Sequence, residues 1–285
     1  MTNVFHTLIA RFLQIPEGQV ERTIGLLNEG ATIPFISRYR KEVTGGLDEV
    51  QIGAIKDQLD KLTELKARKD TILNALEKQE KLTPELKARI ESSWDSNEIE
   101  DIYLPYKPKR VTRAEMARKR GLEPLAKLIA AQKEPFLSGR VPAFVQGEVK
   151  DEEDALSGAR DIIAEWVNEN ERTRNQVRFA FRQAVILAKV IKGKEEEGAK
   201  YRNYFQFEEK LSRCQSHRLL AVRRGEEEGF LRVSIAPADD DACLESLYRQ
   251  YKRNNGACWE QFQLAIDDAY KRLLKPSIEL PKAAN

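Results

Sequence analysis

The 285-residue sequence is poor in the residues that build catalytic and metal sites: it has two histidines and three cysteines. Cys214, Cys243 and Cys258 are odd in number and form no CxxC pair, which argues against a disulfide framework and for a reducing compartment. Walker, GxGxxG, GxSxG and HExxH patterns are absent, so nucleotide-dependent enzymes, serine hydrolases and zinc proteases lack their usual parts. The sequence therefore favours a protein that is not an enzyme and needs no cofactor.

Long apolar runs are also missing. The most apolar later stretch, residues 179–191, contains Arg182 and Lys189 and is shorter than the roughly 20 residues that a bilayer span requires. The N-terminus is interrupted by His6 and Arg11 and has no small-residue cleavage site, so it does not resemble a signal peptide. We expect a cytoplasmic protein without membrane contacts.

An excess of charge of one sign is lacking as well. The 48 Lys and Arg residues against 46 Asp and Glu leave a formal net charge of +2. A strong overall basic field is therefore excluded as an argument for nucleic-acid binding. Any such argument must rest on local clusters.

Residues that break helices are sparse, with 15 Gly and 11 Pro, and the apolar residues recur at helical spacing. Asp48 and Gln51 have the spacing of a capping box, and the apolar stripe that follows predicts one long helix over 48–79, although Lys69 falls where the stripe should continue. Two prolines make residues 104–108 an expected extended boundary. The predicted fold is mainly α: a helix-turn-helix-like N-terminal domain at 1–104, a helical central domain at 105–276 and a tail at 277–285.

The central domain is expected to contain at most a small β element. A helix starting near Asp151 is followed by a second one through Val177, Phe181, Val185 and Ile191. The pattern loses its helical period after that point, and short strands are predicted near 220–236. The last helix is predicted to stop at Pro276.

Metal and acid–base sites have weak signals. Cys214 and His217 have the spacing of two zinc ligands, but the intervals to Cys243 and Cys258 are unlike those of a zinc ribbon, so we expect no metal. Acidic runs between glycines at 193–198 and 225–229 could hold Mg²⁺ or transfer protons. Solvated turns explain them better, because nothing nearby separates the pKa values of their carboxyls.

Basic clusters are more informative. Residues 105–120 contain seven cations against one carboxylate, beside Tyr103 and Tyr106, and a shorter cluster at 38–41 lies where a recognition helix would end. The alternative is that both clusters are solvated faces neutralised by acidic neighbours. The candidate nucleic-acid-binding residues are Arg38, Arg40, Lys41, Tyr106, Lys107, Lys109, Arg110, Arg113, Arg118, Lys119 and Arg120.

The same segments resemble a known family. The string LNEGATIPFISRYRKEVTGGLD at 27–48 closely resembles the N-terminal signature of the Tex family of bacterial transcription accessory proteins. Later blocks recur in the order of that family: DIYLPYKPKR at 101–110, GLEPLA at 121–126, GKEEEGAK at 193–200, SHR at 216–218 and RG at 224–225. The resemblance covers most of the chain.

The resemblance implies a cytoplasmic helical scaffold that binds nucleic acid and works with the transcription machinery, related in architecture to a eukaryotic elongation factor. Family members continue past the equivalent of Pro276 into an RNase H-fold domain, helix-hairpin-helix elements and an OB-fold RNA-binding domain. We therefore expect this chain to be an N-terminal part that binds RNA or DNA weakly and without sequence specificity. The alternative is a protein-interaction scaffold that docks on RNA polymerase or other partners and binds no nucleic acid.

Overall fold

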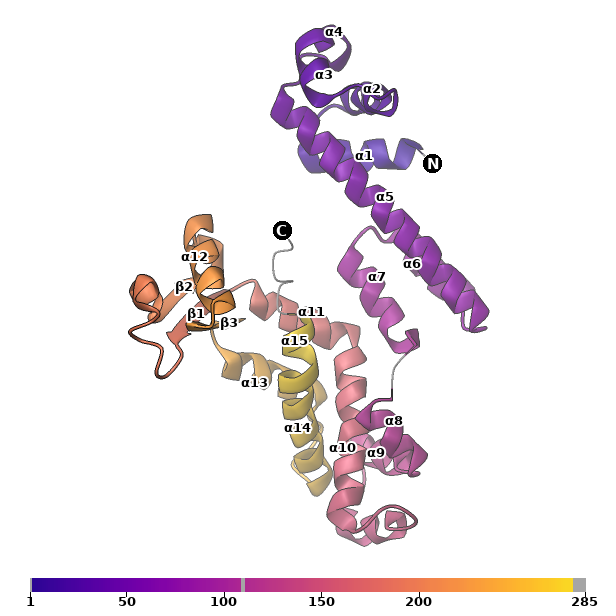
Figure 1. Ribbon diagram of the computed structural model, residues 1–285. Helices are drawn as coiled ribbons and strands as arrows, with labels where there is room; N and C mark the ends of the chain where they lie inside the picture. Colours follow the sequence, from indigo (N-terminus) through magenta and orange to yellow (C-terminus); the bar gives the residue numbers. More distant parts are fainter. Residues whose placement is uncertain (1, 109–110, 279–285) are drawn as a thin grey trace. The chain divides into compact units, whose positions relative to one another are not determined.

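The computed structural model describes residues 2–108 and 111–278, and its architecture is mainly α-helical, as predicted (Figure 1). The chain forms two compact units, residues 1–106 and 107–285. Their division lies slightly after the boundary expected at residue 104.

The first unit is built from helices around one long helix, α5. Its elements are α1 (Thr2–Leu13), α2 (Glu17–Asn28), α3 (Ile33–Tyr39), α4 (Lys41–Thr44), α5 (Glu49–Lys78), α6 (Pro84–Ser92), α7 (Ser96–Tyr103) and a 3₁₀ turn, η1 (Leu104–Tyr106). The predicted capping box starts α5, since the Asp48 carboxylate accepts from the Gln51 N–H and the Gln51 side chain accepts from the Asp48 N–H. The expectation of an extended segment at 104–108 is wrong for 104–106, because the fixed φ of Pro105 also suits a 3₁₀ turn.

Helix α5 contributes to two hydrophobic clusters in this unit. Its N-terminal half packs Ile52 and Ile55 against α1, α2 and α3. Its C-terminal half packs Ile72 and Leu76 against α6 and α7. The 30-residue helix thereby joins two small cores.

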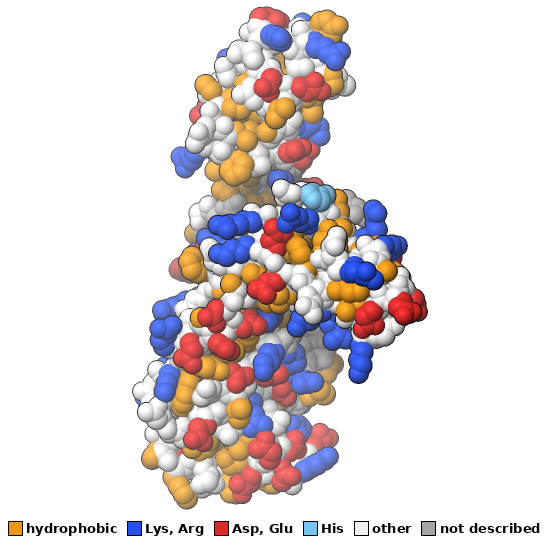
Figure 2. All heavy atoms as spheres, turned by 90° about the vertical axis from the view of Figure 1, so that its left-hand side faces the viewer, with side chains coloured by type: hydrophobic (Ala, Val, Ile, Leu, Met, Phe, Trp, Pro, Cys, Tyr) orange, Lys and Arg blue, Asp and Glu red, His pale blue; other side chains and the backbone are white. Residues whose placement is uncertain are grey.

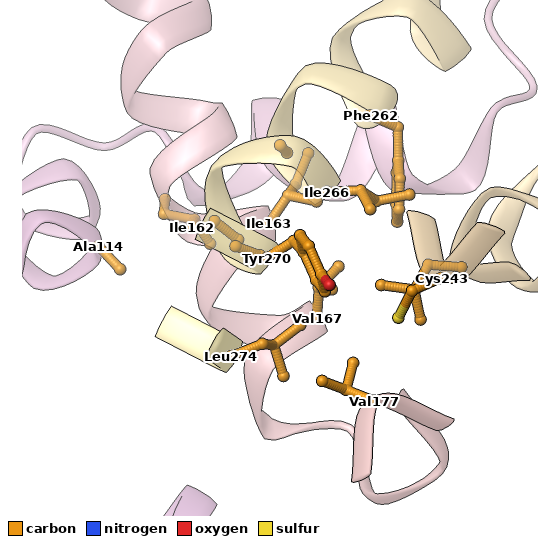
Figure 3. Packing of buried hydrophobic residues seen from close by; sticks show 14 of the residues in the cluster. Ala114, Ile162, Ile163, Val167, Val177, Cys243, Phe262, Ile266, Tyr270 and Leu274 are labelled. Carbon is orange, nitrogen blue, oxygen red and sulfur yellow. The ribbon is translucent and has the colours of Figure 1, made fainter. Parts of the chain in front are cut away.

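The second unit places a helical core beside a small sheet. Its elements are α8 (Arg113–Lys119), α9 (Glu123–Ala131), η2 (Leu137–Gly139), η3 (Val141–Phe144), α10 (Glu152–Glu169), α11 (Glu171–Phe181), β1 (Ala184–Val190), η4 (Ala199–Tyr204), β2 (Gln206–Lys210), η5 (Leu211–Arg213), α12 (Ser216–Glu227), β3 (Leu231–Pro237), α13 (Asp240–Tyr251), α14 (Ala257–Asp268), the π-helical turn η6 (Ala269–Leu274) and α15 (Lys275–Ile278). Helix α10 packs against α8, α9 and α14. Figure 3 shows Tyr270 among the apolar side chains of this core, near Ile266 and Val167.

The sheet differs from the prediction. The second helix ends at Phe181, and the residues expected to continue it form β1, the middle strand of the antiparallel order β2-β1-β3. The spacing of four residues between Val177, Phe181 and Val185 fits a helix, but four is also an even number and fits one face of a strand. Burial alternates along β1 as it does in a strand with one covered face.

The expectation of strands near 220–236 is confirmed only for the end of that window. Of the 220–236 window, only the end belongs to a strand, β3, while α12 occupies the beginning and buries Val222 and Gly225. Strands β1 and β2 lie outside the window. The predicted stop at Pro276 is wrong too, because the chain passes through a π-helical turn into α15; the ring and missing N–H of Pro276 disturb the α-helical bonding of the turn before it.

Candidate nucleic-acid interface

Two arginines of the long basic segment are engaged inside the second unit. The Arg118 guanidinium on α8 donates to Glu165 on α10 at 2.8 Å, and Glu165 is nearly buried. Arg120 donates to both carboxylate oxygens of Asp154 at 2.9 Å. Both arginines therefore hold α8 against α10, which is the neutralisation by acidic neighbours considered as the alternative.

The second of these pairs is reinforced at the start of α10. The Lys150 N–H donates to the Asp154 carboxylate, and together with Arg120 it holds the pKa of Asp154 below its usual value. Asp154 also lies in the first turn of α10, where a negative charge is favoured. Ionised Asp154 is thus a firm anchor for Arg120.

The rest of that segment is divided. Lys107, Arg113 and Lys119 are exposed and make no ion pair within the described residues, although Arg113 acts on the Asp161 carboxyl electrostatically. Tyr106 is half-buried in the first unit, with the Lys81 ammonium 5.9 Å from its ring centre. Lys109 and Arg110 lie outside the described residues.

The shorter cluster has a more open environment. Arg38, Arg40 and Lys41 are all exposed at the junction of α3 and α4, and no acidic side chain pairs with them in the part of the chain that the structure describes. Glu42 follows on α4 and is exposed without pairing to them. The junction therefore presents three cations and one carboxylate to solvent.

Two exposed aromatic rings accompany these cations. Phe35 is 41% exposed and Tyr39 is 64% exposed, with ring centres 5.5 Å apart. The Arg40 guanidinium lies 5.5 Å from the Phe35 ring centre. Cations beside accessible rings suit phosphate contact and base stacking. We call these five residues, Phe35, Arg38, Tyr39, Arg40 and Lys41, the α3 surface.

The candidate residues chosen from the sequence did not include Phe35 or Tyr39. A usable signal was present: Ile33, Ile36 and Ser37 share the helix face that packs inward, which leaves positions 35, 38 and 39 outward. The rings are also four residues apart, where side chains on a helix meet.

Contacts from α2 fix the position of this junction. The Arg22 Nε donates to the Val43 carbonyl at 2.5 Å, and the Gln19 amide donates to the Gly45 carbonyl at 3.4 Å. Gly45 ends α4 in the left-handed region at φ +71°, where glycine is favoured. These contacts and the helix end at Gly45 therefore fix the position of the two helices that bear the α3 surface.

The other candidate sites are engaged or scattered. Among the described residues no group of three His, Cys, Asp or Glu side chains is placed to hold a metal ion. In the acidic runs, Glu197 pairs with Lys194, Glu226 with Arg223 and Glu228 with Lys200. The run at 225–229 is not wholly a turn, because its first residues end α12.

The surface charge and the polarity of the helices agree with the expectations from the sequence. On the face in Figure 2, Lys and Arg side chains are interspersed with Asp and Glu over much of the surface. Within residues 2–108 and 111–278, every helix is too short or too polar to span a bilayer. The exposed cations thus matter through local environment and not through total charge.

Comparison with known proteins agrees with the resemblance. A model described as Tex-like protein N-terminal domain matches residues 3–77, and one described as Tex central region-like matches residues 138–272. The chain is 36% identical over 260 residues to the transcriptional accessory protein Tex of Neisseria gonorrhoeae, covering 88% of this chain and 34% of that protein. It is 41% identical over 247 residues to protein tex of Bordetella pertussis, covering 84% and 31%, respectively.

A more distant relative is human S1 RNA-binding domain-containing protein 1, which is 26% identical over 268 residues, 89% of this chain and 27% of that protein. The chain spans about a third of the length of the bacterial relatives. Two matching regional models and these bacterial relatives show that the chain belongs to the Tex family.

Proposed function

We propose that this chain is a non-enzymatic, cytoplasmic part of a Tex-like transcription accessory protein that binds nucleic acid weakly and without sequence specificity through the α3 surface. The observation that carries the proposal is the exposure of Arg38, Arg40 and Lys41 beside two accessible rings, without pairing carboxylates in the described chain. Phosphates supply sequence-independent affinity for such cations, and rings stack on any base.

The printed names of the relatives support this direction. The gonococcal relative is named a transcriptional accessory protein, and the human relative is named for an RNA-binding domain. Lys107, Arg113 and Lys119 are secondary candidates for phosphate contact, because they are exposed and unpaired among the described residues.

The test is a fluorescence-anisotropy titration of a labelled mixed-sequence oligonucleotide over a range of salt concentrations. The variant R38E/R40E/K41E should bind more weakly, and its salt slope should flatten by roughly one unit for each lost duplex phosphate contact. The matched control is K61E/K78E/K87E, which reverses three exposed cations on α5 and α6 of the same unit. Equal losses in the two variants would assign binding to diffuse charge and refute the α3 surface.

A protein-interaction scaffold is the second candidate. A groove between α11 and α13 is lined by Phe179, Ala180 and Ala242, and Phe179 is 68% exposed. Gln176 Oε1 is buried at this groove and has no hydrogen-bond partner among the described residues. Two results together would favour this candidate. The unchanged chain would bind no oligonucleotide at low salt, and F179D would abolish a pull-down of the chain with RNA polymerase.

A further inference from the structure

The turn between α13 and α14, residues 252–256, is held in one conformation by a buried glutamine from another part of the second unit. Gln132 lies at the C-terminus of α9, is 4% exposed and has φ +52°. Its amide Nε2 donates to the Tyr251 carbonyl at 2.9 Å, and its Oε1 accepts from the Arg253 N–H at 3.1 Å. The Asn254 side chain in turn donates to the Gln132 carbonyl at 2.6 Å.

These bonds bring three cations from distant sequence positions together. Lys133 directly follows Gln132, and Lys252 and Arg253 lie on the turn. All three are exposed and form no ion pair in the described parts of the chain. The neighbouring carboxylate of Glu134 pairs with Arg140 at 3.0 Å.

Two charged side chains of the turn contact other residues of the second unit. The Lys252 ammonium lies 5.7 Å from the ring centre of buried Trp259, and the Arg253 guanidinium reaches the Ala131 carbonyl at 3.5 Å. Asn255 is exposed and adds a polar side chain, whereas the Asn254 side chain donates to the Gln132 carbonyl and accepts from the Gly256 N–H. Lys252 and Arg253 are therefore held on a preorganised turn, which reduces the entropy lost when they bind a ligand.

The start of α14 faces this turn with backbone donors. Its N-cap is Gly256, and no side chain caps the first N–H groups of this 12-residue helix. A helix start carries partial positive charge, although Glu260 in the first turn offsets part of it. The helix end adds to the cationic cluster and does not define the site by itself.

We propose that the cationic turn, formed by Lys133, Lys252, Arg253, Asn254 and Asn255, is a second contact of this chain with the phosphate backbone of nucleic acid. It rests on the proposed nucleic-acid binding of the chain, but it lies in the second unit and does not depend on the α3 surface. Lys, Arg, Asn, backbone N–H groups and helix starts are the usual sources of phosphate contacts, and the turn brings together each of them.

An acidic protein segment is the competing ligand class. Protein interfaces usually have an apolar or aromatic centre inside a polar rim. Residues 252–256 instead expose only Lys, Arg, Asn and Gly, and Trp259 beneath them is buried. The surface therefore lacks the apolar centre of a protein interface, which favours the phosphate backbone of a nucleic acid over a protein segment.

The test uses the full chain with labelled RNA and DNA oligonucleotides of mixed sequence. The variant K133E/K252E/R253E should lose roughly tenfold or more in affinity at low salt and show a flatter salt dependence. The matched control, K192E/K210E/K271E, reverses three exposed cations elsewhere in the same unit that form no ion pair with described residues. The variant K133Q/K252Q/R253Q introduces no negative charge and should lose affinity by a smaller factor. Its thermal unfolding should match that of the parent chain, which shows that the fold is kept.

The outcomes separate this site from the α3 surface. If R38E/R40E/K41E binds normally but K133E/K252E/R253E does not, the proposed α3 interface is wrong and the cationic turn stands. Equal losses in K133E/K252E/R253E and its control would overturn the turn as a site. Competition by polyglutamate as effective as that by unlabelled oligonucleotide would assign the turn to an acidic protein segment and also overturn the proposal.

Discussion

Arg118 and Lys119 are adjacent in the sequence, yet the fold gives them different roles. Arg118 points toward α10 and pairs with Glu165, whereas Lys119 is exposed and unpaired among the described residues. A count of cations along a segment cannot separate these cases, because the partner carboxylate lies far away in the sequence. At the scale of single residues, pairing decides which cations are available to a ligand.

Lys69 shows the same principle inside a core. It interrupts the apolar stripe of α5, and the structure shows that it is 3% exposed. Its ammonium donates to the carbonyls of Glu91 and Ser93 at 2.7 and 2.8 Å and lies 3.9 Å from the Trp94 ring centre. The residue that breaks the pattern satisfies the C-terminal end of α6.

Replacing Lys69 by Met should lower the free energy of unfolding by about 2–3 kcal/mol at neutral pH, because two carbonyls lose a charged donor while the volume is nearly kept. Urea denaturation of the two proteins measures the difference. Lys56, exposed on the same helix, supplies the control K56M, which should change stability by less than about 1 kcal/mol.

The difference in free energy of unfolding between the parent chain and K69M should also depend on pH. Burial lowers the pKa of Lys69 below the ordinary 10.5. Below that lowered pKa the lysine is charged in both states, and the cost of burying the charge is fully present. As pH rises from the lowered pKa toward 10.5, the folded state loses its proton first, so the parent chain should gain stability relative to K69M. A difference that narrows with rising pH would contradict the lowered pKa.

At the scale of elements, local signals located the helices better than the sheet. Asp48 starts a helix as predicted, and Thr83, Asp95 and Asp239 precede later ones; each of these side chains accepts from a backbone N–H of the first turn. Strand β1 depends instead on pairing with β2 and β3, and the residues that pair with it lie up to tens of positions away in the sequence. No local window contains that information.

The two candidate interfaces differ in the same way, because one is formed by consecutive residues and the other by residues distant in the sequence. The exposed cluster at 38–41 was found from the sequence because its residues are consecutive. The cationic turn has no such signal, because Lys133 and Arg253 are distant in the sequence and their segments are joined by hydrogen bonds, chiefly those of Gln132. A site assembled from separate elements has no signature in composition or spacing.

The packing of α10 on its neighbours provides a test at this scale. A Cβ added to Gly158 would lie 2.3 Å from Leu122 Cδ1 and 3.4 Å from Ala117 Cβ, whereas one added to Gly53 on α5 would meet nothing within 4 Å. G158V should therefore lower the free energy of unfolding by about 2 kcal/mol or more through overpacking. G53V makes the same change in open space and should be within about 0.5 kcal/mol of the parent, because Val is no worse than Gly in a helix. Thermal unfolding of both variants measures this, and similar losses in the two would contradict overpacking at Gly158 as the cause.

At the scale of the whole molecule, the two compact units have different kinds of core. The second unit has one large cluster that includes the sheet, α10 and α14, while the first distributes its apolar residues over two smaller clusters along α5. Smaller cores bury less apolar surface and give lower stability. We therefore expect the first unit to unfold at the lower temperature.

Differential scanning calorimetry should resolve two transitions, and single core substitutions should assign them. Ile52 and Ile162 are both 0% exposed, the first in a cluster of the first unit and the second in the core of the other. Either Ile→Ala change removes buried methyl groups and should cost about 2–5 kcal/mol, which lowers the affected transition by roughly 10 °C. I52A should move only the lower transition and I162A only the upper one, because each cluster draws its residues from a single unit. A single transition that both variants lower equally would mean that the units unfold as one cooperative body, and the α3 surface and the cationic turn would then be lost together on heating.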